Sequence, residues 1–164
     1  MNICLCEMTK ELARCYFSKF VADPALFMED QPYQPYVYRA EDADARVDRY
    51  WQMGRIYLAL MLDDEPIGEI VLKNIDNSKK HCTLGISLRS DEFKNKGYGT
   101  EAEIMVLRYA FEKLEMDTVF ADSLIKNMRS QHVLVKAGFE ETHRDKHFVY
   151  YRCDKNQWLD RRNC

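Results

Sequence analysis

The stretch Lys94-Asn-Lys-Gly-Tyr-Gly-Thr100 decides the fold, because the period of the sequence changes across it. Before it, the mostly apolar stretch Thr83-Leu-Gly-Ile-Ser-Leu88 is short and continuous, as expected of a strand. After it, from Tyr98 to Glu115, charged residues recur at intervals of seven, four and three positions on a mostly apolar segment. These intervals correspond to helical turns. The sequence therefore predicts a loop between a strand and a long helix that is buried on most of its circumference.

The segments on either side of this unit predict an alternation of strands and helices. Strands are expected at residues 2–8, 56–62, 67–72, 81–88, 118–125, 139–143 and 148–153, and helices at residues 41–53, 98–115 and 128–137, after Thr9 and after Asp154. The turn Asp63-Asp-Glu-Pro66 joins two of these strands as a hairpin. The strand after the long helix is expected to lie parallel to strand 81–88 through a right-handed crossover. The fold class is therefore a mixed α/β (α+β) domain whose first strands are antiparallel.

The composition indicates a single domain that spans residues 1–164. Hydrophobic residues make up 46% and charged residues 31% of the chain, which is neither a disordered nor a fibrous composition. The net charge of −3 argues against a nucleic-acid partner, which would need clustered Lys and Arg. No apolar run reaches the roughly 18 residues of a membrane span, and the N-terminus lacks the order of a signal peptide. We expect a cytoplasmic protein without a membrane partner, present as a monomer or homodimer.

The cysteines show no spacing that favours a metal site or a disulfide framework. They are Cys4, Cys6, Cys15, Cys82, Cys153 and Cys164. Neither a C-x-x-C pair nor a histidine at zinc-ligand spacing accompanies them. Reduced thiols and no metal cofactor are therefore expected.

The glycines and lysines of the loop favour an anion-binding site. Backbone N–H groups at a helix N-terminus converge on one point, where the helix dipole adds positive potential. Gly97 and Gly99 leave room for a ligand, and Lys94 and Lys96 can neutralise a diphosphate. A solvated turn would use the same residue types, and Gly97-Tyr-Gly-Thr-Glu-Ala102 also matches the G-x-G-x-x-A form of a dinucleotide fingerprint. A nicotinamide-dependent oxidoreductase is the weaker alternative, because that fingerprint expects its first glycine directly at the strand end.

Three motifs lie on the predicted elements: Lys94-Asn-Lys-Gly-Tyr-Gly99 before the long helix, Asn127-Met-Arg-Ser130 after a strand, and Val135-Lys-Ala-Gly-Phe139. Together they resemble the GCN5-related N-acetyltransferases (GNAT), and most closely their ribosomal-protein-alanine and spermidine acetyltransferase-like branch. The resemblance implies a mixed, mostly antiparallel central sheet with a splayed parallel strand pair and flanking helices. It also implies acetyl-CoA as cosubstrate and acetyl transfer to a primary amine. The acceptor would be a protein N-terminus, a polyamine or another small amine.

The resemblance also assigns residues to the cosubstrate. The arm of acetyl-CoA would lie where two parallel strands splay apart, and it would satisfy their backbone groups as an imitation strand. The diphosphate would rest on N–H groups at the start of the long helix. The residues implied to bind acetyl-CoA are Ile86, Leu88, Lys94, Asn95, Lys96, Gly97, Tyr98, Gly99, Thr100, Asn127 and Ser130. Lys94 replaces the family's usual Gln or Arg and so loses planar hydrogen bonding, while Asn127 also suits helix capping.

The catalytic groups are the least complete part of the resemblance. Amide formation from a thioester needs an unprotonated amine and a proton for the leaving thiolate. Where many family members have a tyrosine acid, this chain has Leu134, and Ser130 is the nearest polar substitute. Where others have a glutamate base, this chain has Thr83, so Glu69 is the replacement if its side chain faces the cleft. The alternatives are a solvated strand position for Glu69, proton removal through ordered water, and one of the histidines His81, His132 and His147.

The acceptor is expected to meet two tyrosine-rich segments, the loop from Gln31 to Tyr38 and the closing hairpin from about His143 to Tyr151. Aromatic faces with carboxylates nearby suit an amine. Tyr33, Tyr36 and Tyr38 are the candidate contacts, and the alternative is that they pin the loop to the core. Because two catalytic positions of the family are substituted, a module that binds acetyl-CoA without transferring its acetyl group is the second hypothesis.

Overall fold

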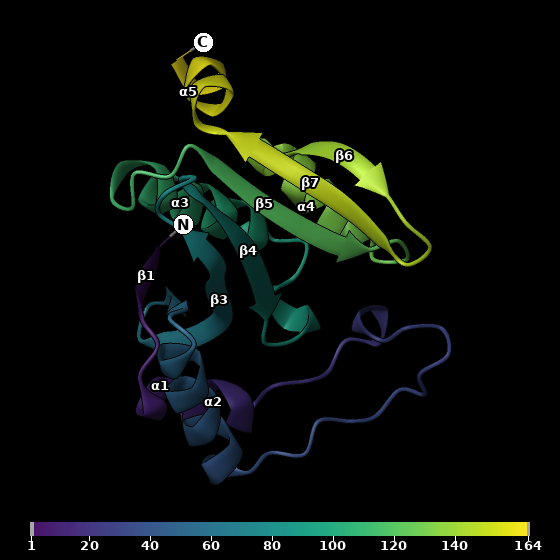
Figure 1. Cartoon of the computed structure of the whole chain (residues 1–164). Coiled ribbons are helices and arrows are strands. Elements are labelled where there is room, and N and C mark those ends of the chain that lie inside the picture. The colour runs from purple at the N-terminus through teal and green to yellow at the C-terminus, as the bar shows by residue number, and fades with distance from the viewer. Residues whose placement is uncertain (1, 164) are drawn as a thin grey trace.

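The computed structural model describes residues 2–163, the side chains of residues 162 and 163 excepted, and shows a seven-stranded sheet flanked by helices (Figure 1). The strands are β1 (Ile3–Glu7), β2 (Ile56–Leu62), β3 (Glu65–Asp76), β4 (His81–Leu88), β5 (Thr118–Leu124), β6 (Glu140–Arg144) and β7 (Phe148–Asp154). The helices are α1 (Lys10–Ser18), α2 (Ala40–Gln52), α3 (Tyr98–Glu112), α4 (Met128–Ala137) and α5 (Lys155–Asn163), with 3-10 turns η1 (Pro24–Leu26) and η2 (Asp91–Phe93). The predicted alternation of strands and helices is confirmed.

The sheet is antiparallel except at one place. Its strands lie in the order β1-β2-β3-β4-β5-β7-β6, and β4 and β5 are paired parallel to each other. Helix α3 makes the crossover between these two strands. The predicted mixed and mostly antiparallel sheet with one parallel pair is therefore confirmed. The largely parallel sheet that a dinucleotide fingerprint accompanies is not formed.

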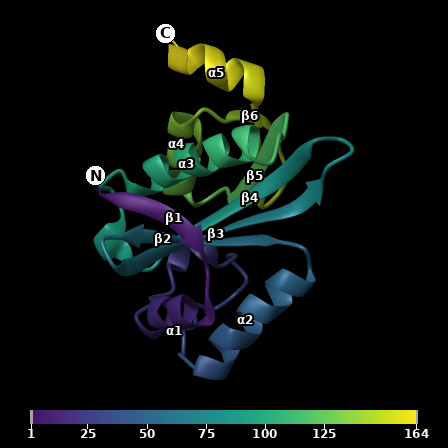
Figure 2. The ribbon, with the colours of Figure 1, turned by 90° about the vertical axis from the view of Figure 1, so that its left-hand side faces the viewer.

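Two hydrophobic clusters cover the two faces of the sheet, and β2 contributes to both. Leu58 and Leu60 join a cluster with α3, α4 and β5, whereas Tyr57, Ala59 and Met61 join a cluster with α1 and α2. This alternation follows because successive side chains of a strand point to opposite faces. Figure 2 shows α1 and α2 on one side of the sheet and α3 and α4 on the other.

Side chains at the helix ends explain several boundaries. Thr9 Oγ1 accepts a hydrogen bond from the Leu12 N–H over 3.2 Å and so caps α1, as predicted. Gly138 ends α4 in the left-handed conformation, with a φ of 116°. Trp158 of α5 donates from Nε1 to the Ala137 carbonyl oxygen over 3.1 Å. Helix α5 is thereby anchored on the end of α4.

The hairpin between β2 and β3 differs from its prediction. Strand β3 starts at Glu65, so only Asp63 and Asp64 form the turn, and Asp63 has a φ of 52°. Pro66 lies inside β3, beside a shift in the register with β2. Such an irregularity tolerates the missing N–H of proline. The long helix is also shorter than predicted, since α3 ends at Glu112.

Four of the cysteines, Cys4, Cys6, Cys15 and Cys82, carry free thiols. Cys164 lies outside the described residues. Among residues 2–163, no group of three His, Cys, Asp or Glu side chains is placed to hold a metal ion. None of the helices in that range is long and apolar enough to cross a bilayer.

Candidate functional site

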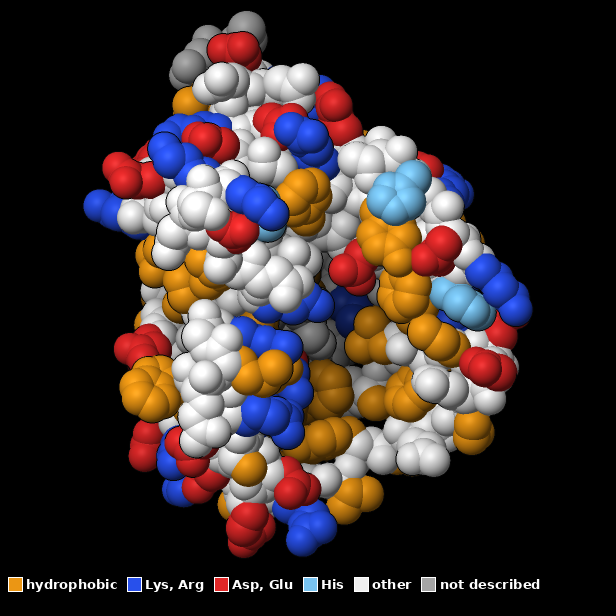
Figure 3. All heavy atoms as spheres, in the orientation of Figure 1, with side chains coloured by type: hydrophobic (Ala, Val, Ile, Leu, Met, Phe, Trp, Pro, Cys, Tyr) orange, Lys and Arg blue, Asp and Glu red, His pale blue; other side chains and the backbone are white. Residues whose placement is uncertain are grey.

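The parallel strands β4 and β5 separate before either of them ends. Their pairing stops at Leu84 and Ala121, yet β4 continues to Leu88 and β5 to Leu124. A cavity of about 400 Å³ occupies the gap between these strand ends. Figure 3 shows the molecule hollowed in the middle of this face, with hydrophobic and basic side chains along the hollow. Unpaired strand edges leave backbone N–H and C=O groups for a ligand to satisfy.

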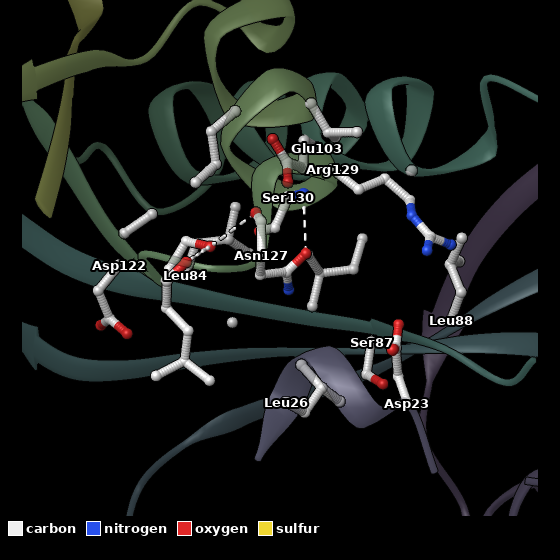
Figure 4. A pocket seen from close by; sticks show the side chains of 18 of the residues that line it. Asp23, Leu26, Leu84, Ser87, Leu88, Glu103, Asp122, Asn127, Arg129 and Ser130 are labelled. Carbon is white, nitrogen blue, oxygen red and sulfur yellow. Dashed lines mark hydrogen bonds between the residues drawn. The ribbon is translucent and has the colours of Figure 1, made fainter. Parts of the chain in front are cut away.

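Helices and a loop complete the cavity wall. Helix α3 contributes Gly99 and Glu103, α4 contributes Arg129, Ser130, Val133 and Leu134, and the segment between α1 and α2 contributes Phe20, Val21, Asp23, Leu26, Met28 and Gln31. In Figure 4, α3 and α4 lie on one side of β4 and η1 lies on the other. A ligand in the gap would therefore be enclosed between the helices and this segment.

The residues predicted to bind acetyl-CoA fall into two groups. Ile86, Leu88, Lys94, Gly99, Asn127 and Ser130 line the cavity. The others, Asn95, Lys96, Gly97, Tyr98 and Thr100, belong to the loop and the first turn of α3. The expected contribution of this second group is through backbone N–H groups, and it stays a prediction.

The loop before α3 leaves the backbone N–H groups of the first helical turn without partners inside the helix. Gly97 caps α3 with a φ of 86°, and Asn95 has a φ of 59°, a region that glycine and asparagine adopt most readily. The first N–H groups of a helix have no partner within it. A Cβ atom on Gly99 would lie 3.6 Å from Val133 Cγ1 and 4.0 Å from Leu88 Cδ1. A larger side chain at that position would therefore project between Val133 and Leu88 at the cavity wall.

Lys94 is engaged by carboxylates in this structure. Its ammonium group forms ion pairs with Asp23 of the segment between α1 and α2 and with Asp91 of η2, the latter over 2.7 Å. Arg129 also approaches Asp91, at 3.4 Å. Only 11% of the Lys94 side chain is exposed. Lys94 therefore ties two loops together at the rim of the cavity, a role that the sequence did not predict.

Asn127 caps α4, as its alternative interpretation predicted. Its Oδ1 atom accepts a hydrogen bond from the Ser130 N–H over 3.2 Å, which Figure 4 marks with a dashed line. Gln131 Nε2 donates to the carbonyl oxygens of Leu124 and Ile125 over 3.0 and 2.7 Å. These bonds fix the turn between β5 and α4. Asn127 and Ser130 are thus held at the cavity wall by the start of this helix.

Glu69 does not line the cavity. It is 7% exposed and belongs to the face of β3 that carries α1 and α2. Arg46 Nη2 donates to Glu69 Oε1 over 2.9 Å, and the Tyr57 hydroxyl donates to Oε2 over 2.5 Å. Burial and the charge of Glu69 raise the pKa of Tyr57. The condition set for a catalytic base, a side chain that faces the cleft, is not met, and the alternative of a solvated Glu69 is wrong because the residue is buried.

The three histidines considered for proton transfer also lie away from the cavity wall. His81 packs edge-on against Phe120, with 5.5 Å between the ring centroids. His132 and His147 are exposed, and neither lines the cavity. Leu134 does line it, as a buried apolar residue. The position of the family's tyrosine acid is therefore occupied here by a hydrophobic side chain.

The tyrosines of the loop from residue 31 to 38 mainly pin that loop to the protein. The Tyr33 hydroxyl donates to the Ala22 carbonyl oxygen over 3.2 Å. Tyr36 packs edge-on against Phe20, with 5.3 Å between ring centroids. Tyr38 is exposed, and none of the three tyrosines lines the cavity. The segment between α1 and α2 reaches the cavity through earlier residues, and contact of the three tyrosines with an acceptor stays a prediction.

Sequence reasoning missed Glu103. The predicted charged stripe of the long helix included Glu101 and left out the acid two positions later. In the structure Glu103 is 1% exposed, lines the cavity, and has an Oε2 atom that is buried without a hydrogen-bond partner. Burial raises the pKa of this carboxyl group to about 8. The signal that could have identified Glu103 is an acidic residue on the otherwise apolar face of the long helix.

Comparison with known proteins decides the family. Residues 2–140 match the acetyltransferase (GNAT) domain family. The chain belongs to this family. The resemblance to the GCN5-related N-acetyltransferases is thereby confirmed, as is the expectation of an acetyltransferase enzyme.

The GNAT chain is similar to relatives with several named functions. A protein of Bacillus subtilis (strain 168), named as a candidate ribosomal N-acetyltransferase, YdaF, is 28% identical over 145 residues, which is 81% of this chain and 78% of that protein. A spermidine N-acetyltransferase chimera from Vibrio cholerae and hSSAT has a TM-score of 0.80 at 15% identity, covering 98% of this chain and 99% of that one. The aminoglycoside acetyltransferase AAC(6')-Ib, solved with coenzyme A, has a TM-score of 0.80 at 17% identity, with coverage of 98% and 99%. At these identities the solved structures support the fold.

Proposed function

We propose that this GNAT domain transfers the acetyl group of acetyl-CoA to a primary amine. The observation that carries the proposal is the gap between β4 and β5, where the parallel pairing stops and a cavity of about 400 Å³ begins beside the glycine-containing start of α3. Such a gap offers a strand edge and a helix N-terminus side by side. An extended arm with a diphosphate at one end matches both features.

The residues of the cavity fit acetyl-CoA. Ile86 and Leu88 line it on a strand whose parallel partner has already diverged, so main-chain groups of β4 are expected to pair with the amides of the arm. The N–H groups after Gly97 are expected to hold the diphosphate. Asn127 and Ser130 face the arm from the start of α4. Bound in this way, acetyl-CoA supplies an activated thioester at the inner end of the cavity.

The acceptor amine is expected to approach between β5 and the segment that joins α1 to α2. Asp122 is exposed near the end of β5 and lines the cavity, and its carboxylate attracts an ammonium group. The named functions of the relatives involve ribosomal, spermidine and aminoglycoside acetylation. This range supports a primary amine as acceptor, with a protein N-terminus, a polyamine and another small amine as the candidates.

Proton transfer is proposed to run through ordered water. The amine must lose a proton before it attacks, and the leaving thiolate must gain one. Glu69 is unsuited to this role because Arg46 and Tyr57 hold its two oxygens on the other face of β3. Ser130 lines the cavity, and its hydroxyl group can orient a water molecule as donor and acceptor.

An acceptor screen tests the proposal. Purified protein is incubated with acetyl-CoA and with peptides, spermidine or an aminoglycoside, and the released thiol is titrated. Turnover with at least one amine is expected. Tight binding of acetyl-CoA without turnover would instead support the second candidate, a sensor module, which the apolar Leu134 at the family's acid position favours.

A glycine substitution tests the proposed diphosphate site. Gly97→Trp is expected to abolish binding of acetyl-CoA, because its side chain and its strained backbone would disturb the start of α3. Gly54→Trp is the matched control, since Gly54 also has a positive φ, 65°, and a Cβ atom there would meet nothing within 4 Å. Calorimetry measures the affinity of the wild type and of each variant for acetyl-CoA. Equal values for the wild type and Gly97→Trp would contradict the proposed site.

A further inference from the structure

Glu103 is a buried carboxyl group that the proposed acetyl transfer does not use. It lies one helical turn after Gly99 on α3 and lines the cavity. Only 1% of the residue is exposed, and its Oε2 atom is buried without a hydrogen-bond partner. Because the great majority of buried polar atoms are partnered, this atom indicates a missing interaction.

Burial favours the neutral form of this carboxyl group. Burial raises the pKa of Glu103 to about 8, and no charged neighbour is among the causes. The charged residues that line the same cavity are Lys73 from β3, Asp122 from β5, Arg129 from α4, and Asp23 and Lys94 at the rim. Two of these cations, Lys94 and Arg129, already pair with carboxylates. A neutral carboxylic acid, unlike a carboxylate, has a hydrogen to donate.

The Glu103 carboxyl group is placed in the cavity between Gly99 of α3 and Ser130 of α4. Helix α3 runs from the loop after β4 towards the start of β5, so Glu103 lies further from that loop than Gly99 does. Side chains of a helix lean towards its N-terminus, which places the carboxyl group over the turn that contains Gly99. Figure 4 shows the carboxyl group directed from α3 towards the cavity, beside the start of α4 that carries Ser130.

We propose that Glu103 is a ligand-binding residue whose neutral carboxylic acid donates a hydrogen bond to an amide carbonyl of the extended arm in the cavity. This inference rests on the proposed function, because the arm of acetyl-CoA contains amides. When the arm runs along β4 in the gap, α3 and α4 lie over one of its faces (Figure 4), so an amide carbonyl that the β4 backbone does not pair can turn towards Glu103. Glu103 provides a buried donor on that side.

Affinity measurements on two variants test the inference. Acetyl-CoA is titrated by calorimetry into the wild type, Glu103→Gln and Glu103→Leu at pH 7. The Gln side chain keeps a donor of similar shape, so its affinity should stay within about 3-fold of the wild type. The Leu side chain leaves the amide carbonyl unsatisfied, so the affinity should fall by about 10-fold. Glu112→Gln, at the exposed far end of α3, is the control that should change nothing.

Urea unfolding separates loss of the ligand contact from loss of the fold. At pH 7 the Glu103→Leu variant should be at least as stable as the wild type, because an apolar side chain replaces a buried polar group that has an unpartnered atom. Weaker binding by a protein of unchanged stability would therefore reflect the missing donor.

The pH dependence of binding gives a second readout. The donor disappears when Glu103 ionises, so the wild-type affinity should fall as the pH rises through about 8, while that of Glu103→Gln should stay flat. At pH 8.5 the wild type should also take up protons on binding, because the complex favours the protonated carboxyl group. Titrations in buffers of different ionisation heat measure this uptake.

The outcomes distinguish the inference from the proposed function. Equal affinities for the wild type and Glu103→Leu would overturn the inference alone. A wild type that fails to bind acetyl-CoA would overturn both. Release of protons when an amine is added to the complex with coenzyme A, which has no acetyl group to transfer, would show Glu103 pairing with the acceptor, and this would overturn the assignment to the amide.

Discussion

Two glutamates are buried on opposite faces of the same sheet, and they differ in what surrounds them. Glu69 is 7% exposed, and Arg46 and Tyr57 bond both of its oxygens. Glu103 is 1% exposed, and its Oε2 atom has no partner. The partnered carboxylate lies away from the cavity, while the other one lines it. Burial therefore does not by itself identify a functional acid; the partners of the acid decide between a structural and a binding role.

The largest effect is expected from removing the partnered glutamate. Glu69→Leu would leave the Arg46 guanidinium, whose side chain is 29% exposed, without its charge partner. Breaking such a buried pair should lower the free energy of unfolding by about 4 kcal/mol, as measured in urea. A double variant, Arg46→Met with Glu69→Leu, should recover most of this loss. A stable single variant would show that the pair is not structural.

A smaller effect that depends on pH is expected at the unpartnered glutamate. The pKa of Glu103 in the folded protein, about 8, is above its ordinary value of 4.5, so the folded state keeps a proton that the unfolded chain releases. The stability present below pH 4.5 is therefore lost as the pH rises towards 8. Between pH 5 and pH 8 the wild type should lose about 3 kcal/mol relative to Glu103→Gln. The free energies of unfolding are measured in urea. A difference between the two proteins that stays constant from pH 5 to pH 8 would contradict the raised pKa of Glu103.

The smallest effect on stability is expected at the rim of the cavity, where Lys94 pairs with two carboxylates. Lys94→Met removes its ion pairs with the half-buried Asp23 and the exposed Asp91, which should cost about 1 kcal/mol of stability because both pairs lie at the rim, within reach of solvent. Asp23→Asn instead leaves the ammonium group with one carboxylate partner, Asp91, and so makes it more available to the diphosphate. That variant should bind acetyl-CoA several-fold more tightly at low salt. An unchanged affinity would show that Lys94 serves only to tie the loops.

Much of the fold could be predicted from local patterns. The change of period around Lys94 to Thr100 placed β4 and α3, and Thr9 and Gly138 marked helix ends that the structure confirms. Pro66 misled the prediction of the β2–β3 turn, because the register shift that accommodates it depends on the neighbouring strand. The gap between β4 and β5 came from the resemblance to a family, since no local rule states where two paired strands diverge.

The site was less predictable because its side chains depend on contacts made by distant residues. Glu69 lies on β3 and its partner Arg46 on α2, and neither residue marks the other in the sequence. Glu103 was within reach of sequence reasoning. Two positions along a helix turn a side chain by about 200°, so Glu103 must face away from the solvated side that carries Glu101. A carboxyl group on that apolar side is costly unless it is neutral or bound.

The shared use of β2 by both hydrophobic clusters limits how the chain can vary in length. Inserting one residue in the middle of this strand would send Leu58 and Leu60 to the layer of α1 and α2 and would move their neighbours the opposite way. A single inserted residue would therefore disrupt two layers together. Changes of length are tolerated better in the exposed loop between η1 and α2, where the neighbouring wall of the cavity can change without disturbing the sheet.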